Sequence, residues 1–244
     1  MRSVRATRYV TPLREGGSLP AIVEADDDGL YVLKFRGAGQ GPKALVAEVV
    51  AGELARALGL PVPELVLCDL DPAIGRAEPD AEIQDLLTAS AGLNLGVDYL
   101  PGALPFSPAA TDRPDPSFAA DVVWLDALVT NVDRTPANPN LLWWHGRIWL
   151  IDHGAALYWH HTQGEPDARA PFAAIGKHVL LPYAGSIMEA DARLAPKLSR
   201  EVVTDVVGLV PDDWLVEDRR LYVDYLLDRL AEPRVFAAAA EELR

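Results

Sequence analysis

The sequence has few cysteines, few basic side chains and no long apolar run, and each shortage excludes a class of protein. The 244 residues include one cysteine, Cys68, so an internal disulfide cannot form. Lys and Arg number 22 against 36 Asp and Glu, which gives a formal net charge of −14. Such an acidic chain repels nucleic-acid phosphates and anionic lipids, so neither is expected as a partner. No stretch approaches the roughly 18 apolar residues of a membrane helix. We therefore expect a cytoplasmic protein without membrane insertion, with Cys68 as a buried thiol.

The first part of the chain predicts β structure followed by a helix. With 50% hydrophobic residues, the chain can bury the core of one large domain or of two small lobes. Glycines and an acidic turn separate predicted strands at residues 8–11, 21–24 and 31–36, which suggests an antiparallel sheet. Apolar residues at every fourth position predict a helix over residues 43–58. A further strand is predicted at residues 64–69.

The second part of the chain predicts mainly helices around one hairpin. A short helix is expected over residues 81–89. Residues 92–107 combine glycines and prolines with an apolar centre, and we interpret them as a connection between lobes. Further predicted elements are an apolar helix (118–130), a hairpin (141–144 and 148–151), an irregular stretch (155–185) and helices at 186–194, 199–208, 216–230 and 233–243. The predicted class is therefore α+β, with a small antiparallel β N-lobe (1–98, including helix 43–58) and a mainly helical C-lobe (99–244).

A polar loop and the hairpin after it hold the residue types that phosphoryl transfer requires. That chemistry needs an Asp near the acceptor hydroxyl, and magnesium held by carboxylate and amide oxygens. Asn138 follows Asp133 by five residues, and Asp152 follows Asn138 by fourteen, across the hairpin. This spacing resembles the catalytic loop and the Asp-x-Gly metal motif of protein kinases. The alternative is that Asp133 and Asn138 only stabilise turns.

Phosphoryl transfer also needs a cation that binds the nucleotide phosphates. A lysine in the first part of the chain, with a glutamate as its partner, matches this need. Lys34 lies in an otherwise apolar predicted strand, and Glu48 lies on the helix that follows. A buried lysine needs a partner, and pairing with Glu48 and phosphates would supply one. Glu53 on the same helix competes with Glu48, which is preferred because its face also carries small residues. An edge-strand lysine facing solvent is the alternative for Lys34.

These motifs together resemble the HipA family of atypical serine/threonine kinases, relatives in fold of the phosphatidylinositol kinases. The resemblance rests on a lysine in a strand, then Glu-x6-Ala-x2-Leu-Gly-Leu-Pro-Val-Pro, then the polar loop, and it covers about residues 16–157. It implies a protein-kinase-like fold with ATP and Mg²⁺ in the cleft between the lobes. The roles implied are phosphate binding by Lys34 paired with Glu48, activation of the acceptor by Asp133, and magnesium binding by Asn138 and Asp152.

Two departures from the family pattern limit what the resemblance implies. No GxGxxG loop is present, and Gly16, Gly17 and Ser18 are the candidates to cover the phosphates with backbone N–H groups. The adenine ring is a separate question, and Tyr99 and Leu100, at the expected connection, are candidates for backbone bonds to it. The second departure is that HipA toxins begin with an extra subdomain that meets a DNA-binding antitoxin. The chain is too short for that subdomain, so no antitoxin partner is expected.

Several alternatives stay open at the level of sequence. The favoured activity is phosphorylation of a protein serine or threonine. The same fold could act on a small molecule or lipid head group, or bind nucleotide without transferring phosphate. His153, His160 and His161, with Asp152, have the ligand types for zinc, although no second spaced cluster supports them. Trp143, Trp144 and Trp149 are expected to pack in the core and on the hairpin rather than to stack on nucleic-acid bases.

Overall fold

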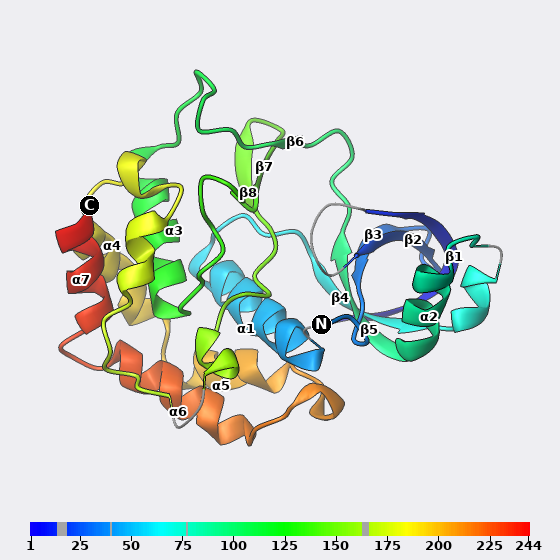
Figure 1. The fold of residues 1–244 in the computed structure, drawn as a ribbon. Coiled ribbons are helices and arrows are strands. Elements are labelled where there is room, and N and C mark those ends of the chain that lie inside the picture. The colour runs from blue at the N-terminus through cyan, green and yellow to red at the C-terminus, as the bar shows by residue number, and fades with distance from the viewer. Residues whose placement is uncertain (14–18, 40, 77, 163–165) are drawn as a thin grey trace. The chain divides into compact units, whose positions relative to one another are not determined.

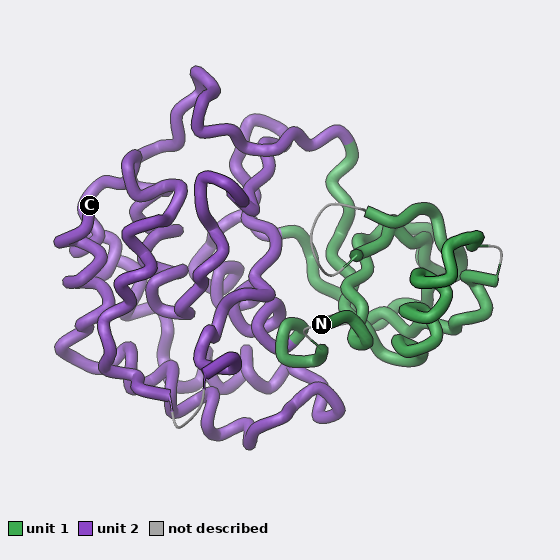
Figure 2. The backbone as a smooth tube through the Cα atoms, in the orientation of Figure 1, with its two compact units in different colours: residues 1–45, 63–101 green, residues 46–62, 102–244 purple. Residues whose placement is uncertain are grey.

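The computed structural model describes residues 1–13, 19–39, 41–76, 78–162 and 166–244, and these form two compact units. Unit 1 comprises residues 1–45 and 63–101, and unit 2 comprises residues 46–62 and 102–244 (Figure 2). One boundary falls inside helix α1 (Pro42–Leu58), so most of this helix belongs to unit 2. Strands and helices both occur, so the α+β class is confirmed.

Unit 1 is built around a closed barrel with the strand order β1-β2-β3-β5-β4 (Figure 1). The strands are β1 (Ser3–Pro12), β2 (Ala21–Ala25), β3 (Leu30–Lys34), β4 (Leu65–Leu70) and β5 (Gly92–Asp98). Alternate residues of β2 and β3, such as Val23 and Leu33, are fully buried, as the two-residue period of a strand requires. The predicted antiparallel sheet was only partly right, because β1 and β4 pair in parallel, with Ser3 opposite Leu67.

The segment predicted to connect two lobes begins instead with a barrel strand. Residues 92–98 form β5, which pairs with β3 on one side and β4 on the other. Gly96 lies opposite both Leu33 and Val66. A Cβ at Gly96 would lie 2.7 Å from a methyl group of Val66, so glycine here permits the close approach of the two strands. Gly96, one of the glycines that suggested a connection, is therefore a packing residue.

Two short helices complete the core of unit 1. They are η1 (Pro72–Gly75) and α2 (Ala81–Ala89), and the Asp80 carboxylate caps α2 by accepting from Glu82 N–H at 3.0 Å. Ile83 and Leu87 of α2 join the buried cluster that contains Leu33 and Cys68. Burial raises the pKa of the Cys68 thiol to about 12, so it stays protonated, and the predicted buried cysteine is confirmed.

Helix α3 (Pro116–Leu128) is the buried centre of unit 2. Asp115 caps it by accepting from Phe118 N–H, and Pro116 occupies its first turn. Ala119, Ala120 and nearly every later residue of α3 are buried, as expected for a helix that is apolar all round. The other helices are α4 (Ile187–Leu194), α5 (Arg200–Gly208), α6 (Arg219–Leu230) and α7 (Val235–Leu243). Among the described residues, no helix is long and apolar enough to cross a bilayer.

A small sheet and several short helices fill the rest of unit 2. The sheet has the order β6 (Leu104–Pro105), β7 (Leu141–Trp144) and β8 (Arg147–Leu150). Trp144 and Trp149 pack edge to face on the β7–β8 hairpin at 5.3 Å, which is the predicted packing role. The short helices are η2 (Tyr158–His161), η3 (Ala173–Lys177), η4 (Leu181–Tyr183), η5 (Ala195–Lys197) and η6 (Asp212–Trp214).

Arg229 of α6 fixes the end of α3, where the polar loop begins. Its side chain is 2% exposed and donates to Ala127 O at 2.7 Å and to Leu128 O at 2.8 Å. It also donates to Ala168 O and Ala170 O, both at 3.2 Å. One guanidinium therefore satisfies carbonyls at the end of a buried helix that could not otherwise reach water.

We expect Arg229→Met to lower the free energy of unfolding by ~3 kcal/mol, because buried carbonyls lose their charged donor. The urea midpoint measures this loss. Arg220→Met is the matched control, since Arg220 lies exposed on the same helix and its replacement should change stability by less than ~0.5 kcal/mol. A native midpoint for Arg229→Met would contradict the role of Arg229 at the end of α3.

Candidate functional site

The polar loop between α3 and β7 brings together the side chains of the predicted residues Asp133 and Asn138 and of the nearby Asn140. Asn138 donates through Nδ2 to Asp133 Oδ2 at 2.8 Å, and Asn140 donates to the same oxygen at 3.3 Å. Thr135 N–H donates to Asn138 O at 3.0 Å, and Asn138 N–H donates to Thr135 O at 3.1 Å, which closes a tight turn between Asp133 and Asn138. The loop therefore holds Asp133 and Asn138 together and leaves Asn138 Oδ1 and Asp133 Oδ1 for other partners.

Asp152 follows β8, and the backbone just before it is hydrogen-bonded to the polar loop. Ile151 N–H donates to Asn140 O at 3.1 Å, which joins the two segments. Asn140 and Asp152 both adopt the left-handed conformation, with φ of 50° and 53°. Asn and Asp are the residues other than glycine that best tolerate it. The Asp152 side chain is exposed.

Arg134, next to Asp133, joins the two segments through its buried side chain. Its Nη1 donates to Asn140 O at 2.5 Å and to Ile151 O at 3.2 Å, and its Nη2 lies 3.3 Å from His153 Nδ1. Arg134 is 1% exposed. One planar guanidinium thus contacts the end of the loop and the residues on both sides of Asp152, which fixes the backbone that carries Asp152.

The charge of Arg134 is balanced by Asp126 of α3. Arg134 Nε donates to Asp126 Oδ2 at 2.5 Å, and both side chains are inaccessible to solvent. Asn131 donates to Asp126 Oδ1 at 3.1 Å, and His178 contributes a bond to Oδ2 at 2.9 Å. Burial alone would raise the pKa of Asp126, but the Arg134 charge and the His178 bond outweigh it and hold that pKa well below the usual range. Asp126 is therefore ionised.

His178 is the neutral member of this network. Leu180 N–H donates to His178 Nδ1 at 3.0 Å, so the ring proton lies on Nε2, which donates to Asp126. Burial lowers the pKa of His178 below its usual value, and the bond to Asp126 offsets this only in part. Val179 N–H also donates to Arg134 O at 3.0 Å. The segment that contains η3 and η4 is thereby attached to the polar loop.

Sequence analysis missed Asp126, Arg134 and His178. Asp126 carried a usable signal, because a carboxylate inside an otherwise apolar helix must find a donor or a cation. Arg134, next to Asp133, was the nearest cation. His178 carried no such signal, since it lies 52 residues after Asp126 and only the fold brings them together.

The predicted lysine and glutamate lie on β3 and α1. Lys34 is half-buried in β3, which has a strand on each side, so the edge-strand alternative is wrong. Glu48 is 2% exposed, whereas Glu53 lies 3.5 Å from Arg56 of the same helix. Glu48 is thus the more buried of the two carboxylates. Lys34 belongs to unit 1 and Glu48 to unit 2, and their pairing stays a prediction.

The predicted nucleotide-contacting segments have different outcomes. Gly16, Gly17 and Ser18 lie outside the described residues. Tyr99 N–H donates to Leu30 O at 2.9 Å, so it is already used within unit 1, and the predicted backbone bond from Tyr99 to adenine would have to use the Tyr99 carbonyl. The Leu100 side chain is 6% exposed, and its backbone role stays a prediction.

The donor set fits magnesium better than zinc. Within the ranges that the structure describes, no three His, Cys, Asp or Glu side chains come together as a metal site. His160 Nε2 lies 3.0 Å from the Tyr222 hydroxyl, and His153 contacts Arg134, so both have structural roles. Asp152 and Asn138 offer the carboxylate and amide oxygens that Mg²⁺ accepts when phosphates complete its coordination.

The lowered pKa of His178 predicts a pH-dependent stability. Because the unfolded chain binds the extra proton more readily, the stabilisation is present above about pH 6.5 and is lost as the pH falls below it. One such group contributes at most ~1.4 kcal/mol per pH unit. His178→Gln, whose amide still donates to Asp126, should show a shallower loss between about pH 7 and about pH 5. Parallel urea-unfolding profiles for the two proteins would contradict this assignment.

Comparisons with known proteins identify a family and a similar fold. The family model described as HipA-like kinase matches residues 7–233. Among solved structures, the chain is similar to the Helicobacter pylori proinflammatory kinase CtkA, with a TM-score of 0.58 and 14% identity over 97% of this chain and 96% of that one. At that identity the likeness shows the fold alone. No curated protein matches the sequence. From the family match, the chain belongs to the HipA-like kinase family and is a phosphotransferase.

Proposed function

We propose that this kinase transfers the γ-phosphoryl group of ATP, with Mg²⁺, to a serine or threonine hydroxyl of a protein. The observation that carries the proposal is the buried Arg134, which contacts both Asn140 O and Ile151 O. These contacts join the loop that carries Asp133 and Asn138 to the turn that carries Asp152. Positioning of this kind is most of what an enzyme contributes to phosphoryl transfer.

Asp133 is proposed to orient the acceptor hydroxyl and to take its proton. Its Oδ2 already accepts bonds from Asn138 and Asn140, which fixes the carboxylate and leaves Oδ1 for the acceptor. The hydroxyl oxygen then bonds to the γ-phosphorus as the bond to the ADP oxygen breaks. The hydroxyl proton passes to Asp133.

Asn138 Oδ1 and the Asp152 carboxylate are proposed to hold the metal. Magnesium, when bound, neutralises charge on the phosphate oxygens. The exposed side chain of Asp152 and the exposed Asn138 are accessible to a metal-nucleotide complex. Gly154 follows Asp152 by two residues and is proposed to let the chain turn away from the nucleotide.

Lys34, Glu48 and the adenine contacts complete the proposal by resemblance to the family. Lys34 would bind the α and β phosphates, and the buried Glu48 would orient it. Gly16, Gly17 and Ser18 would cover the phosphates with backbone N–H groups. The Tyr99 carbonyl and the Leu100 backbone would bind adenine.

Calorimetry of Mg-ATP binding tests the nucleotide site. Asp152→Asn should weaken binding by about tenfold or more while retaining the fold, because Asn tolerates the left-handed conformation of residue 152. Lys34→Met, which keeps the apolar stem, should also weaken binding by about tenfold. Asp213→Asn, an exposed carboxylate of η6, is the matched control and should bind as the native protein does. Failure of the native protein to bind Mg-ATP would refute the proposal.

Asp133→Asn tests the chemical step separately. The change keeps the shape of the side chain but removes the proton acceptor, so phosphoryl transfer should fall by about 10²- to 10⁴-fold. The affinity for Mg-ATP should stay within about twofold of native, because Asp133 is not proposed as a metal ligand. Single-turnover transfer from radiolabelled ATP measures the rate. Transfer at the native rate would exclude Asp133 as the base.

A further inference from the structure

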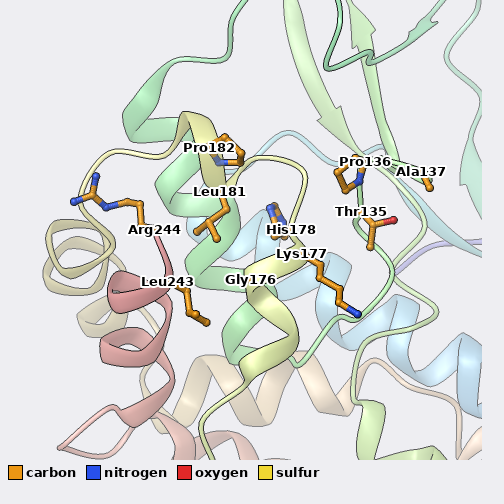
Figure 3. Close-up of a pocket in the computed structure, with 10 residues that line it drawn as sticks. All are labelled: Thr135, Pro136, Ala137, Gly176, Lys177, His178, Leu181, Pro182, Leu243 and Arg244. Atoms are coloured by element: carbon orange, nitrogen blue, oxygen red, sulfur yellow. The ribbon is translucent and has the colours of Figure 1, made fainter.

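A cavity of about 700 Å³ lies in unit 2 beside the polar loop (Figure 3). One wall is the turn formed by residues 135–137. The others come from residues 176–178, residues 181–182 and the end of α7 at residues 243–244. Most of this lining is apolar or proline, and it includes the half-exposed Leu243. Nothing in the metal or nucleotide roles above uses this cavity.

The cavity lies close to where an acceptor hydroxyl would be. Its wall is the turn that joins Asp133 to Asn138, and Thr135 N–H also donates to Asp133 O at 2.9 Å. Two residues of chain span at most ~7 Å, so Thr135 lies within that distance of Asp133, Cα to Cα. A peptide with its hydroxyl at Asp133 would therefore bring side chains one to three positions away into this cavity.

Lys177 gives the cavity a positive charge in a strongly acidic chain. The chain has a formal net charge of −14, yet among the residues that the structure describes no Asp or Glu lines the cavity. Lys177 is exposed, and its side-chain amine forms no hydrogen bond or ion pair with any residue of the described ranges. In Figure 3 the Lys177 side chain lies on the same side of the lining as Thr135. Arg244, on the other side, is already paired with Glu241 at 2.6 Å.

His178 stabilises this wall without adding charge. It donates to Asp126 through Nε2 and is neutral, so Lys177 is the cation of the cavity that remains available. The bond from Val179 N–H to Arg134 O also holds the segment that carries Lys177 against the polar loop. The lysine thus extends from a fixed backbone, which favours selective pairing with a ligand.

We propose that this cavity binds an acidic segment of a protein acceptor, with Lys177 pairing with a carboxylate one to three residues from the phosphorylated serine or threonine. The inference rests on the proposed protein-kinase activity and specifies its substrate class. Charge complementarity selects the occupant, because an acidic segment is repelled by most of this protein's surface and attracted to the cavity. The apolar lining would take a neighbouring aliphatic side chain.

The test uses the full chain and a set of serine peptides in which each position near the serine is in turn Glu, Ala or Lys. We expect the native protein to prefer Glu over Lys at one or two positions by about three- to tenfold in kcat/KM, through KM. Lys177→Glu should reverse this preference, and Lys177→Ala should abolish it, with kcat unchanged. Arg200→Glu is the matched control, since it changes the charge equally at an exposed position of α5 outside the cavity.

The outcomes separate failure of this inference from failure of the kinase proposal. If Mg-ATP binds and peptides are phosphorylated without an acidic preference, or with one that Lys177→Glu leaves intact, the cavity assignment is wrong and the kinase proposal stands. A fall in kcat alone in Lys177→Ala would assign the lysine to the phosphates and overturn the inference. Mg-ATP binding without phosphorylation of any peptide would exclude a peptide acceptor. Absence of Mg-ATP binding would refute the kinase proposal itself.

Discussion

The site depends on a buried ion pair, that of Asp126 with Arg134. Neither side chain is accessible to solvent, so each charge is tolerable only because the other is present. Loss of one partner of such a pair typically costs about 3–5 kcal/mol. Asp126 belongs to the largely buried helix α3, whereas Arg134 belongs to the loop that carries Asp133 and Asn138. The pair therefore transfers the rigidity of the helical core to a loop with little apolar surface of its own.

Hydrogen bonds of Arg134 and of the end of α3 fix the unusual backbone around the site. Thr130, Asn140, Asp152 and Leu157 all have positive φ, between 50° and 53°. Such conformations persist only where the surroundings fix them, and they collect at functional sites. Here the fixing bonds are those of Arg134 to Asn140 O and Ile151 O, together with that of Leu157 N–H to Val129 O at 2.6 Å. Hydrogen bonds thus join the end of α3, the polar loop and the segment around Asp152.

Local sequence patterns predicted most of the elements, because periodicity, caps and turn residues act over a few residues. The predicted helix at residues 43–58 and the hairpin strand at 141–144 agree with α1 and β7. Long-range partners were not predictable in this way. The parallel pairing of β1 with β4, and the place of β5 in the barrel, depend on contacts between distant segments. The spacing of Asp133 and Asn138 revealed the loop, but no spacing revealed that Arg134 beside it was the residue that holds the site together.

The affinity for Mg-ATP of an Arg134→Lys variant, measured by calorimetry with and without magnesium, tests most directly whether this buried pair positions the proposed metal ligands. Lysine keeps the positive charge for Asp126 but lacks the planar fork that reaches Asn140 O and Ile151 O at the same time. The account predicts a folded protein that binds Mg-ATP about 10- to 100-fold more weakly than the native protein, the usual effect of losing a residue that orients metal ligands. A folded Arg134→Lys protein with native affinity for Mg-ATP would contradict it.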